Sequence, residues 1–316
     1  MNAWKWSSAL GICIGVVGCW SPVSHSQENG KLNTVEIKRI MEPGTNTADG
    51  CSIEKFRVVS TCMNREISAV VVLPPGYKEH PAKSYPILYT LHGMDAPYDA
   101  WSQMPPLRRA LAKKPMIVVC LDGDARSFYL DSPYPQMAGR NTNDTTKVAS
   151  LFTTFFFNEL IPCLDQNYRV DAKNRMLTGF SMGGWGAFHY MLAQPGMFSS
   201  VSSLSGAFQI MVPEAGKIEN RLQTLLGPQP EFPERYTNVD FKVRIQKCVQ
   251  QGVKLPPLFL HCGTEDHLLG ENQEMRQFLK EQGVACEYRE SAGGHNWKFW
   301  RDASTDVIDF HWRMLR

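Results

Sequence analysis

The chain has 316 residues, of which 43% are hydrophobic and 20% are charged, and its formal net charge is +2. A chain of this size can bury the core of one large domain. The nearly balanced charge argues against nucleic acid or another acidic polymer as a partner.

The first 26 residues have the features of an export signal. Lys5 places a positive charge near the start, and residues 6–20 are apolar or small, a run too short to span a membrane. Two kinds of processing stay open, because 24–26 has a small-x-small cleavage pattern while Val-Val-Gly-Cys, ending at Cys19, resembles a bacterial lipobox. An uncleaved anchor is a third interpretation. We expect a periplasmic or extracellular protein with no transmembrane span in its mature form, either free or lipid-anchored at Cys19.

The pattern of predicted elements changes once along the chain. A polar linker at 27–34 precedes three predicted strands, at 35–40, 55–60 and 66–73. From residue 85 short apolar strands alternate with helices. The further predicted strands are 87–91, 116–121, 174–177, 201–204, 258–261 and 285–289. The predicted helices are 107–113, 148–164, 185–193, 271–282 and 300–315.

This alternation predicts an α/β fold with a mostly parallel central sheet and helices on both faces. In such sheets the functional site lies beyond the carboxyl ends of the strands. We find no internal repeat. We therefore interpret 27–54 as linker and strand, and 55–316 as one domain with an insertion at about 207–256 that forms a cap or a pocket wall.

The cysteines give two expectations. Cys51 and Cys62 flank a predicted strand and are the pair considered for a disulfide, with free thiols as the alternative. Cys120 and Cys262 lie in apolar strand-like runs and are predicted to be buried thiols. No Cys/His spacing indicates a zinc site.

One turn in the sequence has a pattern that is typical of catalytic serines. Gly179-x-Ser181-x-Gly183 stands between a predicted strand and a predicted helix, which is the pattern of a nucleophile elbow. Glycines two residues to either side are expected because side chains there would clash with the neighbouring strand or helix. We predict that Ser181 is a catalytic nucleophile.

A serine hydroxyl needs a base to accept its proton, and the base needs an acid to orient it. His295 lies in a glycine-rich turn after a strand and before the last helix, where this fold places the base. Asp266 lies in a loop after a strand, between Ser181 and His295, and is the predicted acid. Spacing alone leaves the adjacent Glu265 open as an alternative.

When a serine attacks a carbonyl carbon, a tetrahedral intermediate forms, and its oxyanion needs two hydrogen-bond donors. One is the backbone amide of Met182, directly after the nucleophile. The other is predicted to be the amide of Met94, in the loop after the 87–91 strand. The side chain of His92 in the same loop is expected to be structural.

Several motifs together resemble one known family, the "putative esterase" family of α/β-hydrolases. The resemblance covers roughly residues 55–315. It is carried by Leu73-Pro74-Pro75-Gly76-Tyr77, Leu91-His92-Gly93, Ser127-Phe128-Tyr129 with Asp131, Glu159-Leu160-Ile161-Pro162, Gly179-Phe180-Ser181-Met182-Gly183-Gly184, Ser205-Gly206, Gly263-Thr264-Glu265-Asp266, and Gly294-His295 with Trp297 and Trp300.

This family includes feruloyl esterases, S-formylglutathione hydrolases and mycolyltransferases. The resemblance implies an α/β-hydrolase fold, the same nucleophile, acid, base and oxyanion donors, and acyl transfer from an ester without a metal or organic cofactor. Because the chain is predicted to be exported, the resemblance favours small or polysaccharide-linked esters of the feruloyl or acetyl type as substrates. Segments 127–146 and 207–256 are the expected substrate-binding regions.

Three aromatic residues are predicted to stack on an acyl group or a sugar, with packing inside the protein as the alternative: Trp101, Tyr129 and Phe208. Two other functions stay open. An acyltransferase would use the same three residues with an alcohol as acceptor. A non-catalytic carbohydrate-binding protein is the other, and the complete set of Ser181, Asp266 and His295 argues against it.

Overall fold

The computed structural model describes residues 37–39, 45–137, 146–209 and 219–315. The predicted export signal and Cys19 lie outside these ranges. No helix among the described residues has the length and apolar character needed to cross a membrane.

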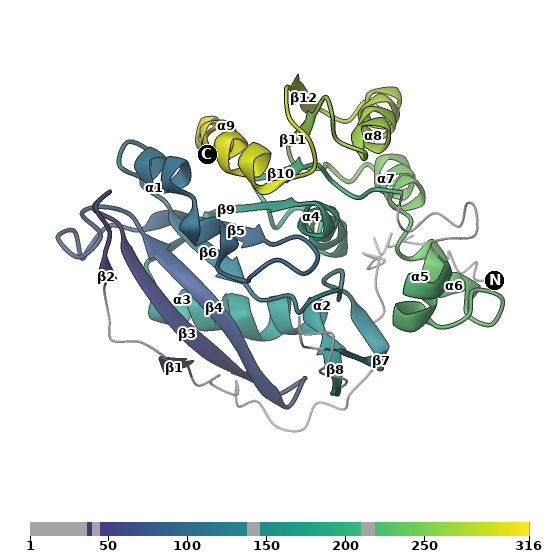
Figure 1. Ribbon diagram of the computed structural model, residues 1–316, viewed down its shortest axis with the longest axis horizontal. Coiled ribbons are helices and arrows are strands. Elements are labelled where there is room, and N and C mark those ends of the chain that lie inside the picture. The colour runs from purple at the N-terminus through teal and green to yellow at the C-terminus, as the bar shows by residue number, and fades with distance from the viewer. Residues whose placement is uncertain (1–36, 40–44, 138–145, 210–218, 316) are drawn as a thin grey trace, which may run out of the picture. The chain divides into compact units, whose positions relative to one another are not determined.

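The described residues form one large sheet that is mostly parallel (Figure 1). Along the sheet the strand order is β1-β3-β4-β6-β5-β9-β10-β11-β12, and β2 pairs with β3. The strands from β6 to β12 run parallel, whereas β3 and β4 form an antiparallel edge. The strand bounds are β1 Ile37–Arg39, β2 Thr45–Asn46, β3 Ser52–Ser60, β4 Arg65–Leu73, β5 Tyr85–Leu91, β6 Ile117–Leu121, β9 Val170–Phe180, β10 Ser200–Leu204, β11 Leu258–Gly263 and β12 Cys286–Ser291.

Helices cover both faces of this sheet, as the sequence pattern predicts. The helix bounds are α1 Pro105–Leu111, α2 Phe152–Phe155, α3 Ile161–Asn167, α4 Met182–Ala193, α5 Glu219–Leu226, α6 Pro233–Thr237, α7 Phe241–Gln250, α8 Leu269–Glu281 and α9 Trp297–Arg313. On one face α1 and α9 lie next to each other (Figure 1). Helices α2, α3, α4, α7 and α8 contribute to the core on the other face.

Strand β6 shows how the two cores are divided. Ile117, Val119 and Leu121 point into the core under α4, and Val118 and Cys120 point into the core under α1 and α9. Successive side chains of a strand point to opposite faces, so a strand covered on both sides must be apolar throughout. The unbroken apolar runs in the sequence are therefore the central strands of a buried sheet.

The register of the parallel strands brings distant loops together. Leu91 pairs with Gly179, and Phe180 pairs with Leu204. The loops after β5 and β10 consequently flank the turn after β9. On the next pair, Gly263 of β11 lies beside Ser291 of β12, so the loops after these strands are also neighbours.

One predicted helix is wrong in its first part. The segment expected to be helical at 148–164 begins as strand β8, Lys147–Leu151, which pairs with β7, Asp131–Met137, inside the segment 127–146 that we expected to bind substrate. Helical structure then runs through α2, a π-helical turn at Phe156–Leu160, and α3. A short apolar run fits either state, and pairing with β7 decides for the strand.

The considered disulfide is also wrong, since Cys51 and Cys62 are both free thiols. The two cysteines lie at opposite ends of β3, which has nine residues. At about 3.3 Å per residue, an extended strand of this length separates its ends by roughly 30 Å. A disulfide needs Cα atoms within about 7 Å of each other.

Candidate active site

Ser181 occupies the strained turn between β9 and α4. Its backbone has φ +55° and ψ −119°, a conformation that L-residues seldom adopt. A Cβ on Gly179 would lie 2.2 Å from the backbone of Gly183, and a Cβ on Gly183 would lie 2.2 Å from the carbonyl oxygen of Leu91. Only glycine fits at both positions, so the glycines let the strand, the turn and the helix pack at this sharp angle.

His295 lies within hydrogen-bond distance of Ser181. Its Nε2 is 2.9 Å from Ser181 Oγ, and its Nδ1 is 3.0 Å from both carboxylate oxygens of Asp266. A carboxylate only accepts hydrogen bonds, so we assign the imidazole proton to Nδ1. Nε2 is then left to accept the hydrogen bond from the Ser181 hydroxyl. This is the geometry that general-base activation of a serine requires.

Asp266 is held as a buried carboxylate. Its burial raises the pKa, but hydrogen bonds from the His295 imidazole, the Leu268 amide and the Ser205 hydroxyl outweigh burial and hold the pKa of Asp266 below its usual range. Glu265, the alternative acid, is exposed and accepts a hydrogen bond from Thr264. Of the two carboxylates, only Asp266 contacts the imidazole.

The two predicted oxyanion donors lie on either side of Ser181. Met182 is the first residue of α4, and amides in the first turn of a helix have no acceptor within the helix. On the other side, a Cβ on Gly93 would lie 3.3 Å from Ser181 Cβ, so the loop that carries Met94 runs directly beside the nucleophile. The helix N-terminus adds a partial positive charge that favours an oxyanion.

His92 orients the peptide that carries the Met94 amide. The Gly123 amide donates to His92 Nε2 at 3.0 Å, so Nδ1 carries the proton and donates to the Gly93 carbonyl at 2.8 Å. This carbonyl and the Met94 N–H belong to one planar trans peptide and point in opposite directions. By holding the carbonyl, the fully buried His92 also fixes the direction of the N–H. The expectation that this side chain is structural agrees with these contacts.

Comparison with known proteins identifies the family. The model of the family described as "Putative esterase" matches residues 60–307. The chain belongs to this esterase family. It is a carboxylic ester hydrolase.

Individual relatives agree with this assignment. An acetyl esterase of Caldicellulosiruptor saccharolyticus is 24% identical over 283 residues, which are 82% of this chain and 97% of that protein. An esterase of Mycobacterium tuberculosis is 27% identical over 245 residues, which are 71% of this chain but only 51% of the longer protein.

Solved structures show the same fold. A ferulic acid esterase has a TM-score of 0.65 and 24% sequence identity, covering 84% of this chain and 99% of its own. An S-formylglutathione hydrolase from Agrobacterium tumefaciens has a TM-score of 0.72 and 20% identity, covering 88% of this chain and 100% of its own. The expected α/β-hydrolase fold is thereby confirmed.

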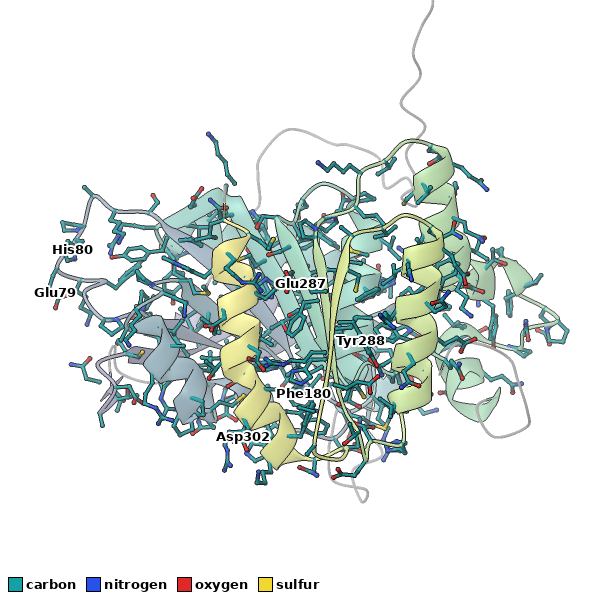
Figure 2. The ribbon with its side chains drawn as sticks, turned by 90° about the horizontal axis from the view of Figure 1, so that it is seen from above. Glu79, His80, Phe180, Glu287, Tyr288 and Asp302 are labelled. Atoms are coloured by element: carbon teal, nitrogen blue, oxygen red, sulfur yellow. The ribbon has the colours of Figure 1, made fainter. Side chains whose placement is uncertain are left out.

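Trp300 in this esterase packs against two sides of the site. Its ring stacks on Phe180, the residue before the nucleophile, at a centroid distance of 4.5 Å and an angle of 15°. It stands perpendicular to the His295 ring at 4.9 Å. Phe180 lies beside α9, the helix that carries Trp300 (Figure 2). The sequence marked Trp300 only as a family feature.

The predicted stacking of substrate on Trp101 and Tyr129 is wrong for the esterase in this conformation, because both side chains are fully buried. Trp101 donates from Nε1 to the Leu91 carbonyl at 3.0 Å. The Tyr129 ring fills the space above Gly123 and Gly186, where a Cβ would lie 2.2 and 2.4 Å from it. Both rings pack the core beneath the site.

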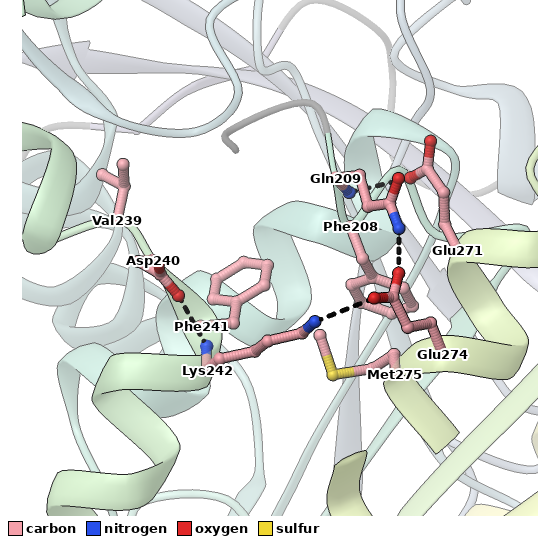
Figure 3. A pocket seen from close by; sticks show the side chains of 9 residues that line it. All are labelled: Phe208, Gln209, Val239, Asp240, Phe241, Lys242, Glu271, Glu274 and Met275. Carbon is pink, nitrogen blue, oxygen red and sulfur yellow. Dashed lines mark hydrogen bonds and ion pairs between the residues drawn. The ribbon is translucent and has the colours of Figure 1, made fainter. Parts of the chain in front are cut away.

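Phe208 is also buried, and it lines a small cavity between the start of α7 and α8 (Figure 3). The cavity holds about 20 Å³ of solvent space, room for about one water molecule and too little for an aromatic acyl group. Figure 3 shows Lys242 and Gln209 both bonded to Glu274 across it. These contacts tie Gln209 and Lys242 to α8.

The sequence reasoning assigned no role to two exposed side chains beside the site, although Trp297 was among the residues that carry the family resemblance. Trp297, the first residue of α9, is 39% exposed, and its ring lies 6.0 Å from Phe180. His267 follows the acid directly, and its ring lies 4.6 Å from that of His295. For His267, its place next to Asp266 was the available signal.

Proposed function

We propose that this esterase hydrolyses small or carbohydrate-linked acyl esters, of the acetyl or feruloyl type, through a covalent acyl-enzyme on Ser181. The observation that carries the proposal is the continuous hydrogen-bonded line from Ser181 Oγ through His295 to the buried Asp266. Such a line serves to make a neutral serine nucleophilic.

In the first half of the proposed reaction, His295 Nε2 takes the proton of Ser181 while Oγ attacks the ester carbonyl. The amides of Met94 and Met182 hold the resulting oxyanion. The tetrahedral intermediate then collapses, the bond to the alcohol breaks, and His295 gives its proton to the leaving oxygen.

In the second half, water replaces the alcohol. His295 takes a proton from water, the hydroxide attacks the acyl carbon, and Ser181 leaves with the proton from His295. Asp266 stays ionised throughout and stabilises the imidazolium.

Losing one oxyanion donor typically lowers the rate on the order of 10²- to 10³-fold.

Substrate class is supported by the names of relatives, which include an acetyl esterase and a ferulic acid esterase. Both Ser181 and His295 are partly exposed, so a carbonyl on a bulky carrier can approach them. The exposed Trp297 offers an aromatic surface near the nucleophile.

The test is a hydrolysis panel with the purified esterase and its Ser181→Ala variant. It compares p-nitrophenyl acetate, p-nitrophenyl butyrate, methyl ferulate and acetylated xylan. Release of acetate from xylan, or of ferulate, that depends on Ser181 supports the proposal. Activity that survives in Ser181→Ala assigns the nucleophile elsewhere, and ester formation on an added sugar alcohol identifies an acyltransferase.

Export, with or without a lipid on Cys19, is a second part of the proposal and rests on residues 1–26. Intact mass and N-terminal sequence of the mature protein test it. A chain that begins at Cys19 with a lipid mass identifies the anchored form. A chain that retains Met1 contradicts cleavage.

A further inference from the structure

Three side chains of types that bind metals lie close together at the active site. Asp266, His267 and His295 each offer one ligand atom, and these atoms all lie within 4.8 Å of one another. His267 Nδ1 lies 3.7 Å from Asp266 Oδ1, and His295 Nδ1 lies 3.0 Å from the same oxygen. The proposed reaction gives His267 no role.

These distances suit a small divalent ion. Zinc binds imidazole nitrogen and carboxylate oxygen at about 2.0–2.2 Å, which separates the ligands of a tetrahedral site by about 3.3 Å. The observed separations of 3.0 and 3.7 Å lie on either side of that value.

The three side chains differ in their exposure to solvent. The side chain of Asp266 is fully buried and that of His295 is 20% exposed, whereas that of His267 is 70% exposed. The fold therefore already holds Asp266 and His295 in position. An exposed side chain rotates at little cost, so His267 can close the site around an ion from solvent.

We propose that Asp266, His267 and His295 form an inhibitory zinc site that switches off the esterase. The inhibition rests on the proposed role of His295 as base. Imidazole and carboxylate ligands also suit copper and nickel, so these ions belong to the same class of inhibitor.

The binding step conserves atoms and charge. In the active form the imidazole proton is on Nδ1 and faces Asp266. Zinc forms bonds to His295 Nδ1, His267 Nδ1 and the Asp266 carboxylate and releases water ligands in exchange, while the His295 imidazole proton moves from Nδ1 to Nε2 through solvent. Nε2 then carries a proton and can no longer accept one from Ser181. Removing the zinc with a chelator restores the first tautomer.

The experiment uses tag-free esterase that has been treated with EDTA and dialysed. Zinc chloride is titrated against p-nitrophenyl acetate hydrolysis, and zinc binding is measured in parallel by calorimetry. The variants are His267→Ala and, as a matched control, His80→Ala, which removes another exposed histidine. Figure 2 labels His80 at the edge of the molecule, away from Phe180.

We expect zinc to inhibit the wild type and His80→Ala equally, and EDTA to reverse the inhibition. His267→Ala should need at least about tenfold more zinc for half inhibition, because losing even an outer partner of a metal site costs that much. Because the His267 ring lies 4.6 Å from that of His295, zinc inhibition of each variant is expressed relative to that variant's own activity without zinc.

Equal zinc sensitivity in His267→Ala would overturn the proposal, because the metal would then act elsewhere, such as at a thiol. Calorimetry separates this result from failure of the proposed function. Zinc affinity that depends on His267, in a protein that hydrolyses no ester, would support the site and refute the esterase mechanism.

Discussion

The indole Nε1 of Trp300 donates a hydrogen bond of 3.1 Å to the hydroxyl of Ser205. Ser205 in turn hydrogen-bonds to the carboxylate of Asp266. Its backbone adopts φ +50°, an unusual conformation for serine, and its amide donates to the His261 carbonyl. The line Trp300–Ser205–Asp266–His295–Ser181 therefore joins the last helix to the nucleophile.

Removing either end of the Trp300–Ser205 bond should slow catalysis without affecting substrate binding. We expect Ser205→Ala and Trp300→Phe each to lower kcat about 10- to 100-fold at nearly constant KM, because small misplacements of catalytic groups have effects of this size. The phenylalanine keeps most of the ring and loses the N–H. Steady-state kinetics of both variants provides the measurement.

The double variant tests whether the pair acts as a unit. If it does, the combined loss should be no larger than the larger single loss, because residues in one network are not additive. Losses that multiply would show that the two side chains contribute independently.

The identity of the acid can be tested with a neighbouring pair of substitutions. Asp266→Asn should lower kcat by about 10⁴-fold, because the amide favours the wrong imidazole tautomer. Glu265→Gln is the matched control and should stay within about twofold, since Glu265 is exposed. Equal losses in the two variants would contradict the assignment. The rates are compared at saturating p-nitrophenyl acetate.

Gly93→Ala should disturb the loop that carries the Met94 amide. The new Cβ would lie 2.8 Å from the Phe180 ring and 3.3 Å from Ser181 Cβ, so the loop must shift away from the nucleophile. We expect kcat to fall about 10²- to 10³-fold, the usual effect of losing an oxyanion donor.

Gly270→Ala provides the control, because a Cβ there meets nothing within 4 Å. Gly270 lies in α8, where alanine is a better helix former by up to about 1 kcal/mol. Thermal melting of both variants separates effects on folding from effects on rate. A folded Gly93→Ala with normal kcat would refute the role of this loop.

Acid should destabilise the fold through a buried histidine. His311 lies between the hydroxyls of Ser200 and Ser202, and burial lowers its pKa from 6.5 to about 3. Its unfolded form therefore binds a proton more readily than its folded form. The stabilisation is fully present above pH 6.5 and is lost as the pH falls from 6.5 toward 3.

Between pH 7 and pH 5 this loss amounts to about 2 kcal/mol in the free energy of unfolding. Urea denaturation at the two pH values measures the change in the wild type. In His311→Gln, which cannot titrate in this range, the difference should shrink by about that amount. An unchanged difference would mean that His311 is not buried in its neutral form.

The fold class and the three residues in the hydrogen-bonded line could be predicted from the amino-acid sequence. The reason is that each of these features can be recognised within a short stretch of sequence. Apolar runs mark strands that are covered on both faces, and glycines on both sides of Ser181 mark a turn that tolerates no side chain. The order of strands along the chain then places His295 and Asp266 at the same edge of the sheet as Ser181.

The side chains that surround that line could be identified only from the packing of the folded chain. Trp101, Tyr129 and Trp297 are all large aromatic residues, and only packing shows that the first two are buried while the third is 39% exposed. The Tyr129 ring is enclosed because Gly123 and Gly186 leave room for it, although the three positions are separated in sequence.

The contacts of Trp300 and His267 are of the same kind. Trp300 reaches Ser205 across 95 residues, and His267 lies beside a ring that is 28 positions further along the chain. Such contacts depend on the register of parallel strands and on the packing of helices against them. A short stretch of sequence does not predict such contacts, because the same residue types would fit equally well in the core or at the surface.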